Sequence, residues 1–290
     1  MFKEIEELKY NKEKKEREKT FNGLTAHEWA LYTQSVFTLE GVPPRSELRM
    51  KHGAAYPKAL TDRLIKMYSH EGDLVFDPFV GIGTTLMSAM NLNRRGIGIE
   101  LSQEFFQYAI RYLQLDNEMI IDRDIKIYND DCRNLEKYVD DESVQATITS
   151  PPYANFIHKV LKRRSKNKDP NKSLTYKYST VRKYTDLPED FGNLSYNEFI
   201  IDIKQLLEKI YKKTKKYGYS VWVVRDFREN GSYVNFHTDL AEAGKQAGFK
   251  WIDLIVWDQT KTIGKIGIVG YPRVFYTNMR HSYIVVLRKE

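Results

Sequence analysis

Residues 76–85 read Phe76-Asp77-Pro78-Phe79-Val80-Gly81-Ile82-Gly83-Thr84-Thr85, and this stretch decides the fold class. Residues 73–79 form a short apolar run typical of a buried strand, and residues 84–92 have a helical pattern. Glycines between a strand and a helix let the backbone come close to a ligand. In open α/β sheets, ligands bind at such turns, beyond the carboxyl ends of the strands. The stretch therefore predicts a strand–turn–helix unit with a ligand site at the turn.

Strand and helix patterns alternate along the chain on both sides of this turn. The alternation predicts a mostly parallel, seven-stranded α/β sheet with helices on both faces, and the last two strands predict an antiparallel edge. Ser102 and Ser195 are expected to cap two of the helices, the second through a Ser-x-x-Glu capping box. Further strands are expected over residues 96–101, 125–129, 144–149, 219–224, 251–257 and 283–287, and further helices over 61–68 and 238–247.

Composition excludes several classes of protein. A chain of 290 residues with 41% hydrophobic and 13% aromatic residues can bury a core, so disorder over most of the chain is excluded. The sequence has no apolar run long enough to span a membrane, and its charged start lacks the apolar stretch of a signal peptide. Cys132 is the single cysteine, and the six histidines lack metal-ligand spacing. We expect a cytoplasmic protein without a metal or a disulfide.

The positive charge is concentrated in one part of the chain. The net charge is +7, and residues 154–185 contain ten basic residues against one acid, Asp169, so the remainder is slightly acidic. Such a concentration suits a polyanionic partner, although a solvated loop has the same composition. We expect four regions: an N-terminal helical arm (1–50), a cofactor-binding and catalytic part (51–153), a basic insert that recognises the target (154–194) and the remainder of the domain (195–290).

The ligand expected at the glycine turn is a nucleoside with a positive charge and no phosphate. Leu86 replaces the third glycine of a dinucleotide fingerprint, and the nucleoside-triphosphate signature is missing. The carboxylate of Asp77 disfavours a pyrophosphate and favours a cation. Glu100, at the end of the second strand, can accept hydrogen bonds from ribose hydroxyls, and Asp131 can reach an adenine amino group. These features point to S-adenosyl-L-methionine, while a plain helix cap is an equally good explanation for Asp131.

The fourth expected strand ends in a proline turn, Thr149-Ser150-Pro151-Pro152-Tyr153. Prolines cannot continue a central strand, so the turn is rigid and its carbonyls lack neighbouring donors. The Ser150 hydroxyl and the Pro151 carbonyl could accept the two hydrogens of an exocyclic amine, which would expose the lone pair of its nitrogen. Tyr153 could stack on a base taken out of its helix. A purely structural turn is the alternative.

Taken together, these motifs resemble the DNA amino-methyltransferases of the cytosine-N4 type. Residues 77–85 resemble the cofactor motif of that family, residues 149–153 its catalytic motif, and His52-Gly53-Ala54-Ala55-Tyr56-Pro57 the short motif that precedes the cofactor strand. The resemblance covers roughly residues 50–290, with the cofactor motif before the catalytic motif. It implies a Rossmann-like class I methyltransferase fold, base flipping and direct methyl transfer to cytosine N4. Adenine-N6 methylation, guanine-amino methylation of RNA and a non-catalytic DNA-binding subunit remain alternatives.

The resemblance also implies roles for individual residues and partners. Double-stranded DNA is the expected partner, and a cognate restriction endonuclease is left open as a second one. Catalysis is expected of Ser150, Pro151, Pro152 and Tyr153. Cofactor binding is expected of His52, Tyr56, Pro57, Asp77, Pro78, Phe79, Gly81, Gly83, Thr84, Thr85, Glu100, Leu101, Asp131 and Cys132. By position and charge, DNA contacts are expected of Lys159, Lys162, Arg163, Arg164, Lys166, Lys168, Arg182 and Lys183.

Overall fold

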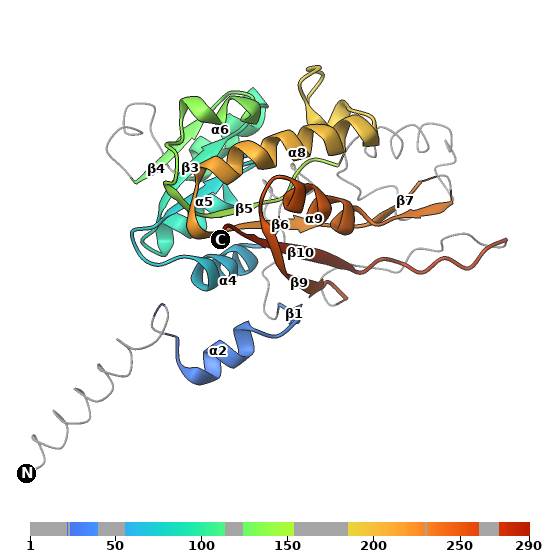
Figure 1. The fold of residues 1–290 in the computed structure, drawn as a ribbon, viewed down its shortest axis with the longest axis horizontal. Coiled ribbons are helices and arrows are strands. Elements are labelled where there is room, and N and C mark those ends of the chain that lie inside the picture. Colours follow the sequence, from blue (N-terminus) through green and yellow to red (C-terminus); the bar gives the residue numbers. More distant parts are fainter. Residues whose placement is uncertain are drawn as a thin grey trace, which may run out of the picture.

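The computed structural model describes residues 22, 24–39, 56–113, 124–153, 185–229, 231–260 and 273–290. Its strands are β1 (Val36–Thr38), β2 (Leu74–Asp77), β3 (Arg95–Ile99), β4 (Ile125–Tyr128), β5 (Val144–Thr149), β6 (Thr214–Val224), β7 (Phe227–Glu229), β8 (Ser232–Val234), β9 (Lys250–Asp258) and β10 (His281–Arg288). Eight of them form one sheet in the order β1-β9-β10-β6-β5-β2-β3-β4, and β7 pairs with β8 in a small hairpin (Figure 1).

The helices lie between these strands. They are α2 (Ala26–Tyr32), α4 (Lys58–Tyr68), α5 (Thr84–Asn91), α6 (Gln103–Tyr112), α8 (Tyr196–Lys213) and α9 (Phe236–Gln246), with short 3-10 helices η2 (Cys132–Lys137) and η3 (Phe191–Asn193). Ser102 caps α6, and Ser195 forms the expected capping box with Glu198 at the start of α8. None of the helices that the structure describes is long and apolar enough to cross a membrane.

The strand directions confirm the expected Rossmann-like α/β fold. The run β6-β5-β2-β3-β4 is parallel throughout, and β10 is antiparallel to both β6 and β9. The sheet has one strand more than expected, because β1 pairs in parallel with β9, with Phe37 opposite Trp257. This strand lies within the region expected to form an arm, so part of residues 1–50 is joined to the sheet.

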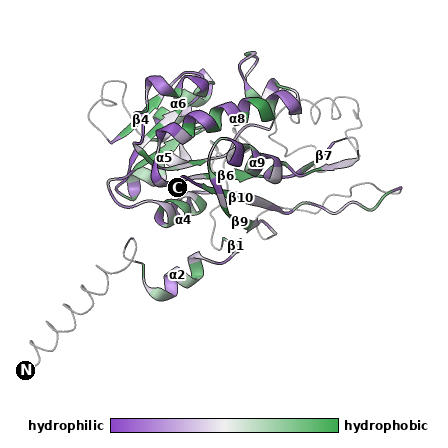
Figure 2. Cartoon of the chain, viewed as in Figure 1, coloured by the Kyte–Doolittle hydropathy of each residue, from purple (hydrophilic) through white to green (hydrophobic). Residues whose placement is uncertain are grey.

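Helices cover both faces of the sheet because strand side chains alternate between two cores. In β6, Val221 and Val223 belong to the core beneath α4, α5 and α6, whereas Trp222 and Val224 belong to the core beneath α8 and α9. Figure 2 shows hydrophobic and hydrophilic residues alternating around α8, as expected for a helix that buries one face. The carboxyl ends of β2, β3, β4 and β5 consequently meet at one edge between these two layers.

The glycine turn between β2 and α5 has a backbone that requires glycine. Gly81 and Gly83 have φ angles of 57° and 88°, in the left-handed region that side chains disfavour. β3 leaves no room for a side chain at Gly98, because a Cβ there would lie 2.3 Å from Val80 Cγ2. The turn is therefore pressed onto β3, which fixes its position relative to Glu100.

Candidate active site

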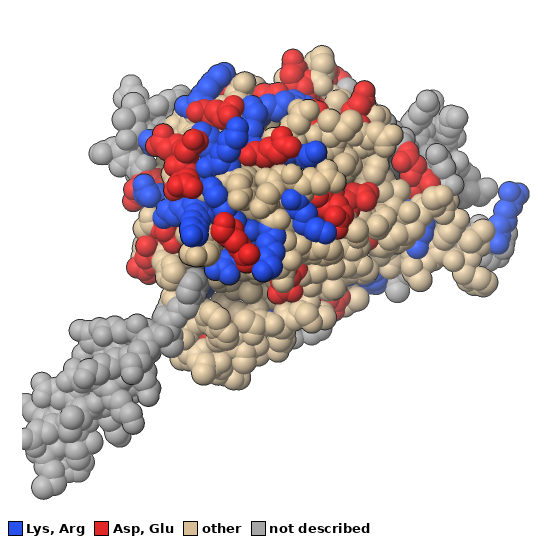
Figure 3. Space-filling model, viewed as in Figure 1, with Lys and Arg blue, Asp and Glu red and all other residues tan. Residues whose placement is uncertain are grey.

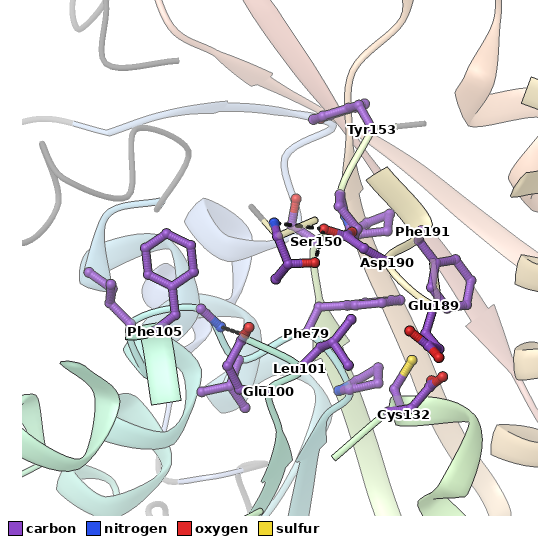
Figure 4. A pocket seen from close by; sticks show the side chains of 18 of the residues that line it. Phe79, Glu100, Leu101, Phe105, Cys132, Ser150, Tyr153, Glu189, Asp190 and Phe191 are labelled. Carbon is purple, nitrogen blue, oxygen red and sulfur yellow. Dashed lines mark hydrogen bonds between the residues drawn. The ribbon is translucent and has the colours of Figure 1, made fainter. Parts of the chain in front are cut away.

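A cavity of ≈ 840 Å³, measured out to the solvent, opens at the carboxyl edge of the sheet. Figure 4 shows Glu100 and Phe105 on one side of the cavity, Cys132 and Glu189 on another, and Ser150 and Asp190 between them. The lining residues are Tyr56, Pro78, Phe79, Val80, Gly81, Ile82, Thr84, Glu100, Leu101, Phe105, Asp131, Cys132, Ser150, Pro151, Pro152, Tyr153, Thr185, Glu189, Asp190 and Phe191.

Glu100 is held by backbone amides on two sides. Gly81 N donates to its Oε2 at 2.7 Å, and Ser102 N donates to its Oε1 at 2.8 Å. Burial nevertheless raises the pKa of Glu100 to about 8, because desolvation outweighs the two amides and the charges of Asp77 and Asp190 add to it. A ligand that donates hydrogen bonds to this carboxylate would favour its ionised form.

Asp77 lies behind the turn rather than at the surface of the cavity. It is buried, and its Oδ1 accepts hydrogen bonds from Thr149 Oγ1 at 2.6 Å and Phe79 N at 3.0 Å. Its Oδ2 is buried with no hydrogen-bond partner in the described part of the chain. Burial raises the pKa of Asp77, opposed by these hydrogen bonds and the nearby hydroxyls of Thr85 and Tyr56. Asp77 therefore ties the glycine turn to the end of β5 from behind, and it is not among the residues that line the cavity.

Asp131 caps a short helix and also borders the cavity. Its carboxylate caps η2, where Oδ1 accepts from Arg133 N at 2.8 Å, and Oδ2 accepts from Arg133 Nη1 at 2.7 Å. It also lines the cavity, next to the buried Cys132. Burial raises the pKa of the Cys132 thiol well above its usual value, so the thiol stays protonated and unreactive.

The proline turn forms the wall opposite the glycine turn. Ser150 directly follows β5, whose last residue, Thr149, hydrogen-bonds Asp77 and so ties the two turns together. The Tyr153 ring packs edge-on against Phe236 of α9, with ring centres 6.1 Å apart. Burial raises the pKa of Tyr153 against the opposing influence of Arg225 and its backbone amide. The catalytic turn predicted from the sequence and the cofactor turn thus border the same cavity.

Residues 185–191 form a further wall of the cavity, which the sequence analysis did not predict. Thr185 N and Oγ1 donate to the buried Asp190 Oδ2 at 3.0 and 2.9 Å, which folds this segment back on itself. The Phe191 ring then packs edge-on against Phe79 of the glycine turn, with centres 5.3 Å apart. The sequence placed these residues in the basic insert, and the Asp190 turn is too local a pattern to reveal which cavity it borders.

The charge of the cavity has one sign. Asp131, Glu189 and Asp190 line it together with Glu100, whose raised pKa of about 8 keeps it mostly protonated at neutral pH, and none of the described lining residues is a lysine, arginine or histidine. An acidic wall repels phosphates and attracts cations. The site therefore suits a positively charged ligand and is unsuited to one that carries phosphates.

Most of the predicted site residues lie together. Four of them are not among the lining residues: Pro57, Asp77, Gly83 and Thr85. Thr85 hydrogen-bonds Tyr56 Oη at 2.7 Å, and Pro57 and Gly83 begin α4 and α5. Val80, Ile82 and Phe105 line the cavity and were not predicted. Outside the described residues lie His52, Lys159, Lys162, Arg163, Arg164, Lys166, Lys168, Arg182 and Lys183.

Residues 2–111 match the model of a family described as DNA methylase. The match includes the glycine turn and Glu100 and ends before the proline turn. The type II methyltransferase M.HpaI of Haemophilus parainfluenzae is 44% identical over 70 residues, which are 24% of this chain and 22% of that protein. M.MthZI of Methanothermobacter thermautotrophicus is 40% identical over 121 residues, 38% of this chain and 34% of that protein. The chain thus matches between about a fifth and a third of the length of these relatives.

A solved methyltransferase from Pyrococcus furiosus overlaps with a TM-score of 0.45 at 14% identity, covering 81% of this chain and 83% of that one. Over the matched residues, these sequence similarities agree with the resemblance to DNA amino-methyltransferases that the motifs indicated. They do not separate the cytosine-N4 from the adenine-N6 type.

Proposed function

We propose that this protein is an S-adenosyl-L-methionine-dependent DNA methyltransferase that acts on the exocyclic N4 amine of a cytosine flipped out of duplex DNA. One observation carries the proposal: the glycine turn and the Ser150-Pro151-Pro152-Tyr153 turn line a single acidic cavity. A binding module would need only the first turn. The second turn supplies the acceptors that a poorly nucleophilic amine requires.

The residues present fit the proposed cofactor. Glu100 would accept hydrogen bonds from the ribose, Asp131 lies where an adenine amine could donate, and Phe105 and Leu101 offer apolar contact to the base. The acids Asp131, Glu189 and Asp190, with no basic residue among the described lining residues, suit a cationic group. Bound there, the cofactor supplies a methyl group on a positively charged sulfur.

The proline turn would hold the target amine. Ser150 Oγ and the Pro151 carbonyl would each accept one amine hydrogen, which draws the nitrogen toward tetrahedral geometry and exposes its lone pair. Tyr153 would stack on the flipped ring, and its contact with Phe236 keeps it in place. Catalysis on this scheme is positioning and electrostatics, without a covalent intermediate on the protein. Serine rather than aspartate at position 150 supports cytosine as the target.

The test is to incubate the protein with isotopically labelled cofactor and either duplex DNA or transfer RNA, and to identify the labelled nucleoside by mass spectrometry. N4-methylcytosine is the expected product. Labelled N6-methyladenine would overturn the choice of base, and label in transfer RNA alone would overturn the choice of nucleic acid. Failure to bind the cofactor in a calorimetric titration would overturn the proposal as a whole.

A further inference from the structure

A projection extends beyond the carboxyl edge of the sheet, and we call it the aromatic arm. It consists of β7, β8 and residues 273–280, which lead into β10 and lie at the right of Figure 1. β5 and β6 run parallel with Thr149 opposite Trp222, and the start of β10 faces the end of β6, with Tyr283 opposite Val224. The aromatic arm therefore begins at the same edge as the proline turn.

The two parts of the aromatic arm are held together by Arg228. Its guanidinium lies over the rings of Tyr233 and Tyr276, 5.6 and 5.0 Å from their centres, and Nη1 donates to the Thr277 carbonyl at 3.0 Å. Tyr233 Oη in turn donates to the buried Asp226 Oδ2 at 2.7 Å, just after β6. These contacts orient the aromatic arm relative to the catalytic edge.

The aromatic arm presents apolar side chains to solvent. Phe275 is fully exposed, at 107% of its reference area, and Tyr233 and Val274 are about half exposed, at 49% and 47%. A phenylalanine in this position gains nothing from folding, because its ring stays in water. It gains only when a partner covers it, and clustered exposed apolar groups are typical of interaction surfaces.

The charge around the aromatic arm suits a polyanion. The described residues of the aromatic arm include three basic side chains, Arg228, Arg273 and Arg280, and one acid, Glu229. Figure 3 shows basic side chains at the end of the projection, whereas both signs are mixed over the rest of that face. Aromatic rings between basic side chains are the combination that stacks on bases and neutralises phosphates.

We infer that the aromatic arm is a second DNA-contacting surface, in which Phe275 stacks on a base at an opened step of the duplex and Arg273 contacts phosphate. The inference deepens the proposed function and rests on it, because a duplex placed at the proline turn also passes the neighbouring arm. An apolar wedge at an opened step would occupy space next to an extruded base.

The test separates stacking from charge by following duplex binding over a range of salt concentrations. Phe275→Ala should weaken the binding of a fluorescent duplex about ten-fold at every salt concentration, with an unchanged slope of log affinity against log salt. Arg273→Gln should reduce that slope by about one. Phe275→Trp should keep wild-type binding, and Ile201→Ala, which truncates an exposed apolar side chain on α8 outside the aromatic arm, should have little effect.

The outcomes distinguish this inference from the proposed function. Cofactor affinity of the variants, measured by calorimetry, should equal that of the wild type, which also shows that they fold. If the wild type methylates DNA and Phe275→Ala binds duplex as the wild type does, the inference alone is wrong. It is also wrong if Phe275→Ala changes only the binding to phosphatidylglycerol vesicles or the oligomeric mass. If the wild type binds no cofactor but the salt series behaves as expected, the proposed function is wrong, and the aromatic arm remains a DNA-contacting surface.

Discussion

The guanidinium carbon of Arg133 lies 4.3 Å from the centre of the Phe191 ring. The same guanidinium donates to Asp131 at 2.7 Å, to Asp202 at 2.6 Å and to the Glu189 carbonyl at 2.8 Å. One side chain thus joins η2, α8 and the cavity wall formed by residues 185–191. The planar fork of arginine suits this arrangement, and lysine could reproduce only its charge.

Arg133→Lys should lower cofactor affinity and destabilise the fold by about 1–3 kcal/mol, because the stacked plane and the charge-assisted hydrogen bonds are lost. Urea unfolding and calorimetric titration measure the two effects. Lys137→Ala is the matched control on η2, since Lys137 makes one exposed ion pair with Asp130 and should matter little. Equal effects of the two changes would contradict a positioning role for Arg133.

Glu100 should give the free protein and the cofactor complex opposite pH trends. Its folded pKa of about 8 exceeds the ordinary 4.5, so the folded state holds a proton that the unfolded state releases, and stability should fall as pH rises from 4.5 toward 8. Cofactor affinity should instead rise with pH over the same range, because cofactor hydroxyls would donate hydrogen bonds to the ionised carboxylate. Glu100→Gln should reduce both dependences and leave the contribution of Asp77, whose pKa burial also raises. Affinity that is independent of pH in the wild type would refute the ribose role.

Ser150→Ala should lower turnover about a hundred-fold while cofactor affinity is retained, because the proposed role of the serine is to accept a hydrogen of the target amine. Tyr153→Phe keeps the stacking ring and should affect turnover much less. Single-turnover kinetics and calorimetry separate the two quantities. Equal losses of turnover and cofactor affinity in Ser150→Ala would mean that the serine only maintains the turn.

Gly98→Ala should destabilise the fold by about 1–3 kcal/mol and weaken cofactor binding, because the new methyl group would displace Val80 and the glycine turn above it. Thermal unfolding and titration with the cofactor provide the measurements. Unchanged cofactor affinity in the folded variant would show that the position of the turn does not depend on β3.

Neutralising Lys162, Arg163 and Arg164 together should reduce the salt slope of duplex binding by about 3, if each contacts a phosphate. Fluorescence anisotropy over a salt series measures the slope, and a wild-type slope in the triple variant would remove these residues from the DNA surface.

The sequence predicted the strands and caps well because their signals are local. β5 has the predicted bounds, and the capping box at Ser195 is present as expected. β6 begins five residues earlier than predicted, at Thr214, since pairing with β5 extends it through polar residues that carry no strand signal. β1, a strand of three residues, has too short a pattern to detect and exists through its pairing with β9.

The site was predicted where motif and fold coincide, and missed where only the tertiary structure brings residues together. Gly81, Glu100 and Ser150 follow strand ends, so a parallel sheet necessarily gathers them. Phe191 and Glu189 reach the cavity through the Asp190 turn and the Arg133 contacts, and neither is visible in spacing or periodicity.

If the protein acts as proposed, the acidic residues of the cavity would also influence the exchange of spent cofactor for fresh cofactor. S-adenosyl-L-methionine would enter with a positive charge on its sulfur and leave without that charge, so the acidic residues would attract it more strongly before methyl transfer than after it. The spent molecule would therefore be held less firmly than the fresh one, and exchange between the two would favour renewed turnover without any movement of the chain.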